Sequence, residues 1–276
     1  MTVVDSASDD GSAEMVRERF PGVRLIALTE NRGFAAACNQ GAAACETDLI
    51  LFLNPDTRLF ADSLRVAVEA FARPGHERVG IVGLALQDDS GQVVPSCARF
   101  PRAHHFLTHA VGIDRVWPQT GHAMTEWDHL STRRVDQVIG AFFMIRRSLF
   151  ERLDGFDERF FVYLEDLDLS LRARRMGLLT RFVASPPSFH LGGGVSRQVK
   201  AERLFYATRS RLLYGFKRLP AWQAWTHAAT TLVCEPLART VQALLRRSWQ
   251  VLRFTWRGFA LVYRDLPALW RARRWR

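Results

Sequence analysis

The alternation of apolar and polar residues along the chain predicts strands and helices in turn. The clearest signal is residues 49–53, five consecutive apolar residues that stop at Asn54, Pro55 and Asp56. Such a run is typical of a strand buried on both faces of a parallel sheet, and proline cannot continue a central strand. Two polar side chains therefore follow its carboxyl end, where open α/β sheets place ligands. A plain Asn/Pro/Asp turn is the alternative.

Shorter apolar runs precede this strand. The predicted elements are strands at 2–4 and 23–28 and helices at 14–20 and 35–45. Met15, Val16 and Phe20 would form the buried face of the first helix. Because strands and helices alternate up to residue 53, the pattern predicts a parallel, doubly wound α/β sheet.

Further elements are predicted beyond Asp56. They are helices at 62–72, 148–153 and 165–176, and strands at 79–86, 92–95, 135–146 and 180–184. The turn sequence at 88–91 predicts a hairpin, and Gly177 is a usual residue just after a helix. Residues 97–134, which hold five of the eight histidines, are expected to form a long variable connection.

Composition limits the class of protein. A chain of 276 residues with 48% hydrophobic and 24% charged residues fits one α/β domain plus an extension. The four cysteines show neither paired metal spacing nor a disulfide framework, which favours a reducing, cytosolic compartment. We expect no signal peptide and no transmembrane helix, since no apolar run reaches 18 residues.

Positive charge is concentrated near the end of the chain. The net charge is +10, yet residues 200–276 alone hold 16 Lys/Arg against 3 Asp/Glu, with six of the eight tryptophans. Arginines beside large apolar residues are typical of an interfacial helix, with arginine at anionic headgroups. We therefore expect residues 216–276 to form a basic amphipathic helical tail on an anionic membrane surface. Packing of these helices on the rest of the protein is the alternative.

A series of short motifs, in order, carries a resemblance. They are residues 3–12 (VVDSASDDGS), 31–34 (NRGF), 39–41 (NQG), 53–56 (LNPD), 140–142 (GAF), 155–161 (GFDERFF), 165–168 (EDLD) and His190 with Gly192–Gly194. In this order the chain resembles the inverting family 2 glycosyltransferases of the GT-A fold. It is most similar to the rhamnosyltransferase-like members that build bacterial surface polysaccharides. The resemblance implies an α/β GT-A (Rossmann-like) domain over residues 1–215, with a mostly parallel sheet and flanking helices.

The resemblance also implies an element ahead of this sequence. Family members open with a strand and a helix before the strand that here contains Val3, Val4 and Asp5. That first strand lies in the middle of the sheet and helps to shape the nucleotide pocket, so we expect it to be missing. A truncated, inactive glycosyltransferase-like protein is therefore an alternative function.

Breaking the glycosidic bond of a nucleotide sugar builds negative charge on the β-phosphate, and a divalent cation usually stabilises it. Mg²⁺ and Mn²⁺ prefer carboxylate and phosphate oxygens. By resemblance, Asp56 stands at the place of the family's Asp-x-Asp motif and binds Mg²⁺ or Mn²⁺, while Asn54 contacts the nucleotide. His190 would complete the metal shell, and a hydrogen-bonded loop histidine is its alternative.

Other nucleotide and acceptor residues are also implied by the resemblance. Asp5 would hydrogen-bond the base or ribose, and Asn31 with Gly33 would let the backbone pass close to the nucleotide. The alternatives are a capping or turn aspartate, and a turn glycine with positive φ. Gly140 and Ala141 are expected to contact the acceptor.

An inverting displacement needs a general base for the acceptor hydroxyl. We expect Asp166 to be that base, with Glu165 beside it at the catalytic and acceptor site, and Asp168 to cap or support the helix. Repulsion among three acids in four residues is expected to raise one pKa. Acids favoured at a helix start by the dipole are the alternative.

The predicted function is an inverting glycosyltransferase that moves a sugar, rhamnose being the leading candidate, from a nucleotide-diphosphate donor to a glycan or lipid-linked acceptor. It would work in the cytoplasm, peripheral to the inner face of the cell membrane. A nucleotidyltransferase is a competing possibility, although the early glycine-rich phosphate loop usual in that class is absent from the sequence. The Arg/Trp tail also suits a nucleic-acid binder, but no matching motif supports one, so we expect no nucleic-acid partner.

Overall fold

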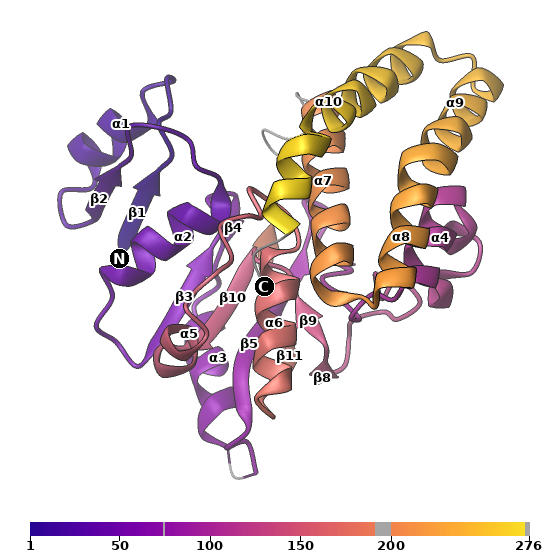
Figure 1. The fold of residues 1–276 in the computed structure, drawn as a ribbon. Helices are drawn as coiled ribbons and strands as arrows, with labels where there is room; N and C mark the ends of the chain where they lie inside the picture. Colours follow the sequence, from indigo (N-terminus) through magenta and orange to yellow (C-terminus); the bar gives the residue numbers. More distant parts are fainter. Residues whose placement is uncertain (74, 191–199, 274–276) are drawn as a thin grey trace.

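The structure is a computed structural model that describes residues 1–73, 75–190 and 200–273 (Figure 1). It opens with alternating elements: β1 (Thr2–Asp5), α1 (Ser12–Arg19), β2 (Arg24–Ala27), α2 (Phe34–Ala43) and β3 (Leu49–Leu53). These match the predicted order. The buried face expected for α1 is wrong, however, because Met15 and Phe20 are 42% and 52% exposed and its only buried residue is Ala13.

The central sheet is mixed. Its path runs β3-β10-β5-β11-β4, with β6 paired to β5 and β8 to β11. The new strands are β4 (Thr57–Arg58), β5 (Val79–Gln87), β6 (Val93–Val94), β8 (Arg133–Val135), β10 (Phe142–Arg146) and β11 (Leu179–His190). The α/β class is confirmed. A mostly parallel sheet is not, because only β5–β11 and β1–β2 pair in parallel and β10 runs antiparallel to both of its neighbours.

The sheet is interrupted between β1 and β3. Strands β1 and β2 form a separate two-stranded sheet, so β3 lies at the edge of the seven-stranded one. Burial of β3 on both faces is therefore only partly confirmed: Ile50 and Phe52 are buried, whereas Leu53 is exposed.

The predicted strand over residues 135–146 is divided into β8, β9 (Gln137–Val138) and β10. Its backbone leaves the ladder because the amide of Ile139 donates to Ser96 O and the amide of Gly140 donates to the Asp166 carboxylate. The expected connection before it also contains regular structure. It includes β7 (Cys97–Ala98), α4 (Ala103–Val111) and two short 3₁₀ turns.

Apolar side chains form a core on each face of the central sheet. Along β5 and β10, alternate residues point to opposite faces. Ile81 and Ile145 belong to the core under α2, α5 (Arg147–Arg152) and α6 (Glu165–Arg175), whereas Val82 and Met144 belong to the core under α3 (Ser63–Ala72). Burial on both sides explains why β5 is apolar at nearly every position.

The C-terminal helices share a third core with the sheet region. They are α7 (Lys200–Arg218), α8 (Ala221–Ala229), the π-helical turn η4 (Thr230–Cys234), α9 (Glu235–Leu245) and α10 (Trp249–Arg273). Phe160 and Leu167 pack in one cluster with Leu213, Val262 and Leu269. The predicted division after residue 215 thus falls inside α7. Over the described residues, no helix is both long and apolar enough to cross a bilayer.

A buried ion network joins α6 to α7. Asp168, which is fully buried, accepts hydrogen bonds from Arg172 Nε (2.9 Å), Lys217 Nζ (2.9 Å) and Arg218 Nε (2.7 Å). Lys217 also bonds Asp157. Burial alone would raise the pKa of Asp157, but hydrogen bonds from Arg159 and Lys217 outweigh it and hold that pKa well below its usual range. Asp168 therefore supports α6, as expected, by charge pairing with another helix.

Replacing Asp168 with asparagine should lower the free energy of unfolding by about 3 kcal/mol, because three cations would lose their buried carboxylate. Urea denaturation at pH 7 measures this change. Asp62→Asn is the matched control, since Asp62 pairs with Arg65 on the surface and its side chain is 61% exposed. It should change stability little. Equal losses in the two variants would show that the buried network contributes no more to the free energy of unfolding than a surface ion pair does.

Candidate functional site

Asp166 is fixed at the start of α6 by three hydrogen bonds. Its Oδ2 accepts from the amide of Gly140 (2.8 Å) and from Gln137 Nε2 (2.9 Å), and its Oδ1 accepts from the amide of Leu167 (2.7 Å). Burial raises the pKa of Asp166 to about 6, against the lowering effect of these donors. A carboxyl with this pKa is mostly ionised at pH 7 yet close enough to neutrality to take up a proton.

Glu165 shares the buried environment of Asp166. It is 5% exposed, and its Oε2 has no hydrogen-bond partner among the described residues. Burial and the adjacent Asp166 carboxyl raise the pKa of Glu165 well above its usual value. Cys38 on α2 is close enough that burial, Glu165 and Asp166 all raise the pKa of its thiol. The two acids therefore titrate as a coupled pair, in which charge on Asp166 disfavours ionisation of Glu165.

Gly140 and Ala141 connect this acid pair to the turn after β3. The amide of Gly140 donates to Asp166 Oδ2, while Ala141 O accepts a hydrogen bond from the amide of Asn54 (3.2 Å). Thr57 Oγ1 also donates to Ala141 O (3.3 Å). Two adjacent residues thus hold the predicted base and the predicted donor turn in fixed positions.

Asp56 and His190 are brought together by strand pairing. His190 lies opposite Thr57 in the β11–β4 ladder, which places its Nε2 3.2 Å from Asp56 Oδ1. Both side chains are partly buried: that of Asp56 is 23% exposed and that of His190 is 13% exposed. The carboxylate of Asp56 suits Mg²⁺ or Mn²⁺, and the imidazole of His190 can add one nitrogen ligand, so phosphate oxygens would have to fill the remaining positions. Among the residues that the structure describes, no group of three His, Cys, Asp or Glu side chains is placed to hold a metal ion. Gly192–Gly194 lie outside the described residues.

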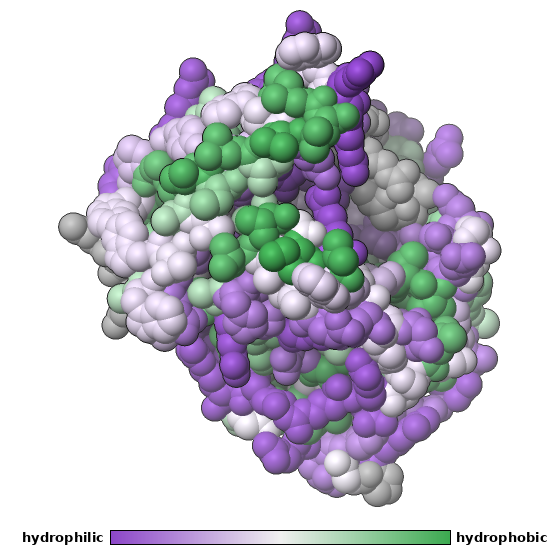
Figure 2. All heavy atoms as spheres, turned by 90° about the vertical axis from the view of Figure 1, so that its right-hand side faces the viewer, coloured by the Kyte–Doolittle hydropathy of each residue, from purple (hydrophilic) through white to green (hydrophobic). Residues whose placement is uncertain are grey.

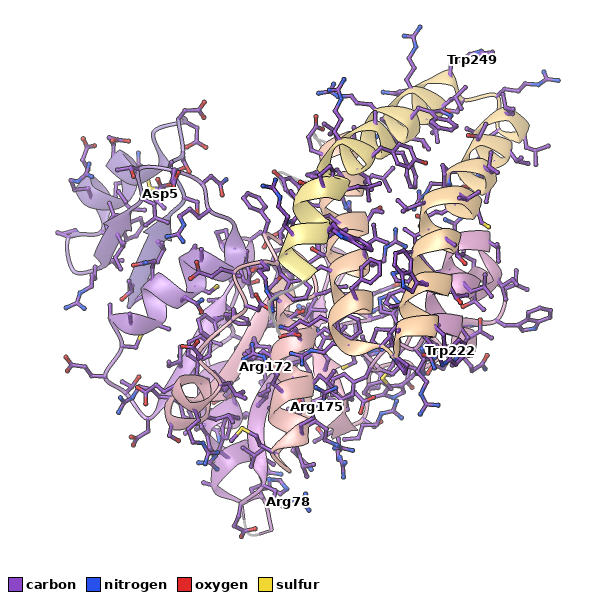
Figure 3. All side chains as sticks on the ribbon, in the orientation of Figure 1. Asp5, Arg78, Arg172, Arg175, Trp222 and Trp249 are labelled. Carbon is purple, nitrogen blue, oxygen red and sulfur yellow. The ribbon has the colours of Figure 1, made fainter. Side chains whose placement is uncertain are left out.

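The remaining predicted nucleotide residues lie in the N-terminal part of the fold. Asp5 is at the end of β1 (Figure 3) and accepts a hydrogen bond from the amide of Ser8 (3.0 Å). Asn31 Oδ1 accepts from the amide of Gly33 (3.0 Å), and a Cβ on Gly33 would lie 2.2 Å from Phe161 O. Packing against Phe161 and a φ of +91° already account for this glycine.

A polar cavity of about 950 Å³ lies elsewhere, between α2, α5 and the loop at 153–159. Its lining includes Arg147, Arg172 and Lys217, and none of the predicted site residues. Several of these cations already contact carboxylates, as Lys217 does with Asp157 and Asp168. Cavity size therefore does not identify the site, which the chemistry around Asp166 and Asp56 defines better.

Gln137 is a site residue that the sequence interpretation missed. It is 3% exposed, and its side-chain amide donates to Asp166 Oδ2 and to Val138 O. The available signal was a glutamine inside an otherwise apolar strand pattern, which needs a partner when buried. The partner lies 29 residues away in the sequence, so only the fold reveals it.

Substituting Gln137 with methionine should raise the titration midpoint of Asp166 by about one pH unit. The lost donor favoured the ionised carboxylate, and a charge-assisted hydrogen bond is worth roughly that amount. Carboxyl-carbon NMR on aspartate-labelled protein follows this titration. Gln92→Met, at an exposed hairpin position, is the control. An unchanged midpoint in Gln137→Met would mean that Gln137 does not tune the acid pair.

Comparison with known proteins is consistent across sequence and fold. The family model described as Glycosyl transferase family 2 matches residues 1–154. The N-acetylglucosaminyl-diphospho-decaprenol L-rhamnosyltransferase of Mycobacterium tuberculosis is 29% identical, over 89% of this chain and 84% of that protein. The rhamnosyltransferase WbbL of Escherichia coli is 30% identical over 52% of each chain. A mannosyltransferase from Pyrobaculum calidifontis, solved with GDP-Man and Mn²⁺, shares the fold. Its TM-score is 0.51 at 21% identity, over 96% of this chain and 78% of that one.

Proposed function

The chain belongs to glycosyl transferase family 2, whose model covers more than half of it, and we propose that it transfers a sugar with inversion from a nucleotide-diphosphate donor to an acceptor hydroxyl. The observation that carries this proposal is the Gly140–Ala141 bridge. It holds the carboxylate of Asp166 and the turn at Asn54 within one hydrogen-bonded unit. A donor at the turn and an acceptor at Asp166 would therefore meet in a fixed orientation.

Asp166 would act as the base. Oδ2 already accepts two hydrogen bonds, whereas Oδ1 accepts one from the amide of Leu167. Oδ1 therefore has the freer lone pair for the acceptor hydroxyl. As that oxygen attacks the anomeric carbon, its proton passes to Oδ1 and the nucleotide diphosphate leaves with the electron pair of the broken bond. Burial and Asp166 raise the pKa of Glu165, and in its protonated form Glu165 would hydrogen-bond the acceptor without repelling the ionised base.

The donor's diphosphate would lie at Asp56 and His190, which would hold Mg²⁺ or Mn²⁺ together with phosphate oxygens. When bound, the cation would neutralise charge that develops on the leaving diphosphate. Asn54 would contact the nucleotide beside it. Asp5, at the end of β1, and Asn31, in the loop between β2 and α2, are proposed as further nucleotide contacts.

The sugar and the acceptor are proposed from the relatives. A rhamnosyltransferase acting on a diphospho-decaprenol substrate, by its name, aligns along 89% of this chain. We therefore propose rhamnose as the transferred sugar and a lipid-linked glycan as the acceptor, in polysaccharide synthesis. Because such an acceptor is anchored in a bilayer, the enzyme would work in the cytoplasm at the inner membrane surface. A nucleic-acid role has no support in the site.

Asp166→Asn tests the base directly. Turnover should fall at least about a hundred-fold while donor affinity stays near wild type, because the base acts only on the acceptor in the transition state. Because burial raises the pKa of Asp166 to about 6, the ionised carboxylate is less favourable in the folded protein than in the unfolded one, so removing its charge should not destabilise the fold at pH 7. Transfer from thymidine-diphospho-rhamnose and calorimetry with the same donor provide the two readouts.

The pH dependence of the wild-type enzyme is a second readout of the same group. Activity should rise through about pH 6 as Asp166 ionises and level off above it. Turnover by Asp166→Asn that is close to wild type would assign the base to another residue. So would a fall in activity below about pH 6 that persists in Asp166→Asn.

Metal dependence tests Asp56 and His190. Thorough EDTA treatment should abolish transfer, and Mg²⁺ or Mn²⁺ should restore it. Asp56→Ala should weaken donor binding measured with Mn²⁺ present and change it little without metal, because the carboxylate acts through the cation. Asp62→Ala, a surface aspartate outside the site, is the control. Activity that survives EDTA would remove the metal from the mechanism.

A further inference from the structure

The outward side of α9 is apolar although its inward side is already buried. Every exposed side chain from residue 233 to 245 is apolar: Val233, Cys234, Leu237, Val241, Leu244 and Leu245. On the inward side, Glu235, Pro236 and Ala243 are buried. A helix whose inward side is already packed normally presents polar side chains to water on its other side. The outer side of α9 therefore has the composition of a contact surface.

Neighbouring elements extend this surface. Figure 2 looks onto the right-hand side of Figure 1 and shows apolar side chains gathered in bands at the height of α9 and of α4 with α8. Trp222, at the start of α8, and Trp249, at the start of α10, are each 69% exposed (Figure 3). We define the outer apolar face by its exposed residues: Leu107, Val111, Val116, Trp117, Trp222, Val233, Leu237, Val241, Leu244, Leu245 and Trp249.

Uncompensated positive charge borders this face. Arg246 and Arg247 are exposed directly after α9. Residues 221–276 contain ten arginines and two acids. Both acids are ion-paired: Glu235 is buried and bonds Arg211 and Arg239, and Asp265 bonds Arg209. Burial would raise the pKa of Glu235, but Arg211 and Arg239 lower it to about 2. The exposed Arg246 and Arg247 therefore give the edge of the outer apolar face positive charge.

We propose that the outer apolar face docks onto a bilayer that contains anionic lipids. The leucines and valines of α9 would enter below the headgroups, and Arg246 with Arg247 would contact lipid phosphates. Aliphatic residues with flanking tryptophan and arginine are the composition of an interfacial helix, and the positive charge of Arg246 and Arg247 complements anionic headgroups. This inference goes beyond the transfer reaction, because vesicle binding needs no catalysis.

The end of α10 is only partly covered. Leu269 is 4% exposed, whereas Trp270 is 39% exposed and its ring lies 5.3 Å from that of Trp225, centroid to centroid. Exposed aliphatic side chains are concentrated instead on α9, where Leu237 and Leu245 are 55% and 81% exposed.

Vesicle flotation with the full chain tests the proposal. Wild-type protein should float with phosphatidylglycerol-containing vesicles. Leu237→Glu with Leu245→Glu should lower partitioning into vesicles at least about ten-fold, since two apolar side chains that would enter the bilayer become charged. The matched control is Leu64→Glu with Val68→Glu on α3, where the exposed fractions are 48% and 46%. It should float like wild type. Leu237→Ala with Leu245→Ala, which keeps the helix, should show a smaller loss in the same direction.

Charge is tested separately. Arg246→Gln with Arg247→Gln should weaken flotation with anionic vesicles roughly ten-fold and leave the weaker binding to neutral vesicles unchanged. Equal loss in the α3 control, or no vesicle binding by wild type, would overturn the proposal. The proposal would also be overturned if the wild-type protein formed a dimer without lipid, bound no vesicles, and became a monomer in Leu237→Glu with Leu245→Glu. The outer apolar face would then join two copies of the chain. None of these outcomes depends on the sugar-transfer assay, so the proposed function can fail independently.

Discussion

The position of helix α6 depends on one buried carboxylate that pairs with three cations. Asp168 takes hydrogen bonds from Arg172 on its own helix and from Lys217 and Arg218 at the end of α7. A fully buried charge is tolerated only when it is paired in this way. Since α7 also packs with α10 in the third core, this network joins the C-terminal helices to the helix that carries the acid pair. The tail predicted from composition is thus part of the framework of the site.

Two acids on α6, two residues apart, have opposite surroundings. They are about 200° apart around the helix, so Asp168 faces the cations of α7 while Asp166 faces Gln137 and Gly140. Every hydrogen bond that the described residues give to Asp166 comes from a neutral N–H group. Burial therefore raises the pKa of Asp166, to about 6. The charge-paired acid is suited to support, and the unpaired one to proton transfer.

Local sequence was enough to predict features whose cause is also local. The order of elements up to β3, the helix start at Glu165 and the left-handed Gly177 after α6 all follow from periodicity and termination signals. The antiparallel direction of β10 and the edge position of β3 depend on strand pairing across more than 80 residues, which periodicity does not encode. The same holds for Gln137, whose partner is on α6. Composition predicted that the tail is amphipathic, but the side of α9 that faces outward depends on how it packs with α4 and α10.

The pKa of Asp166 is compatible with work at an anionic membrane. A surface potential of roughly −30 mV concentrates protons about three-fold and so lowers the local pH by about half a unit. With a pKa of about 6, a base at pH 7 in bulk would still be ionised in roughly three-quarters of molecules at that surface. The effect also falls off within about 10 Å. A carboxyl whose pKa were raised to 7 would be ionised in only about a quarter of molecules under the same conditions. The donors from Gln137, Gly140 and Leu167, which lower the pKa that burial raises, therefore keep the base usable where a lipid-linked acceptor would be found.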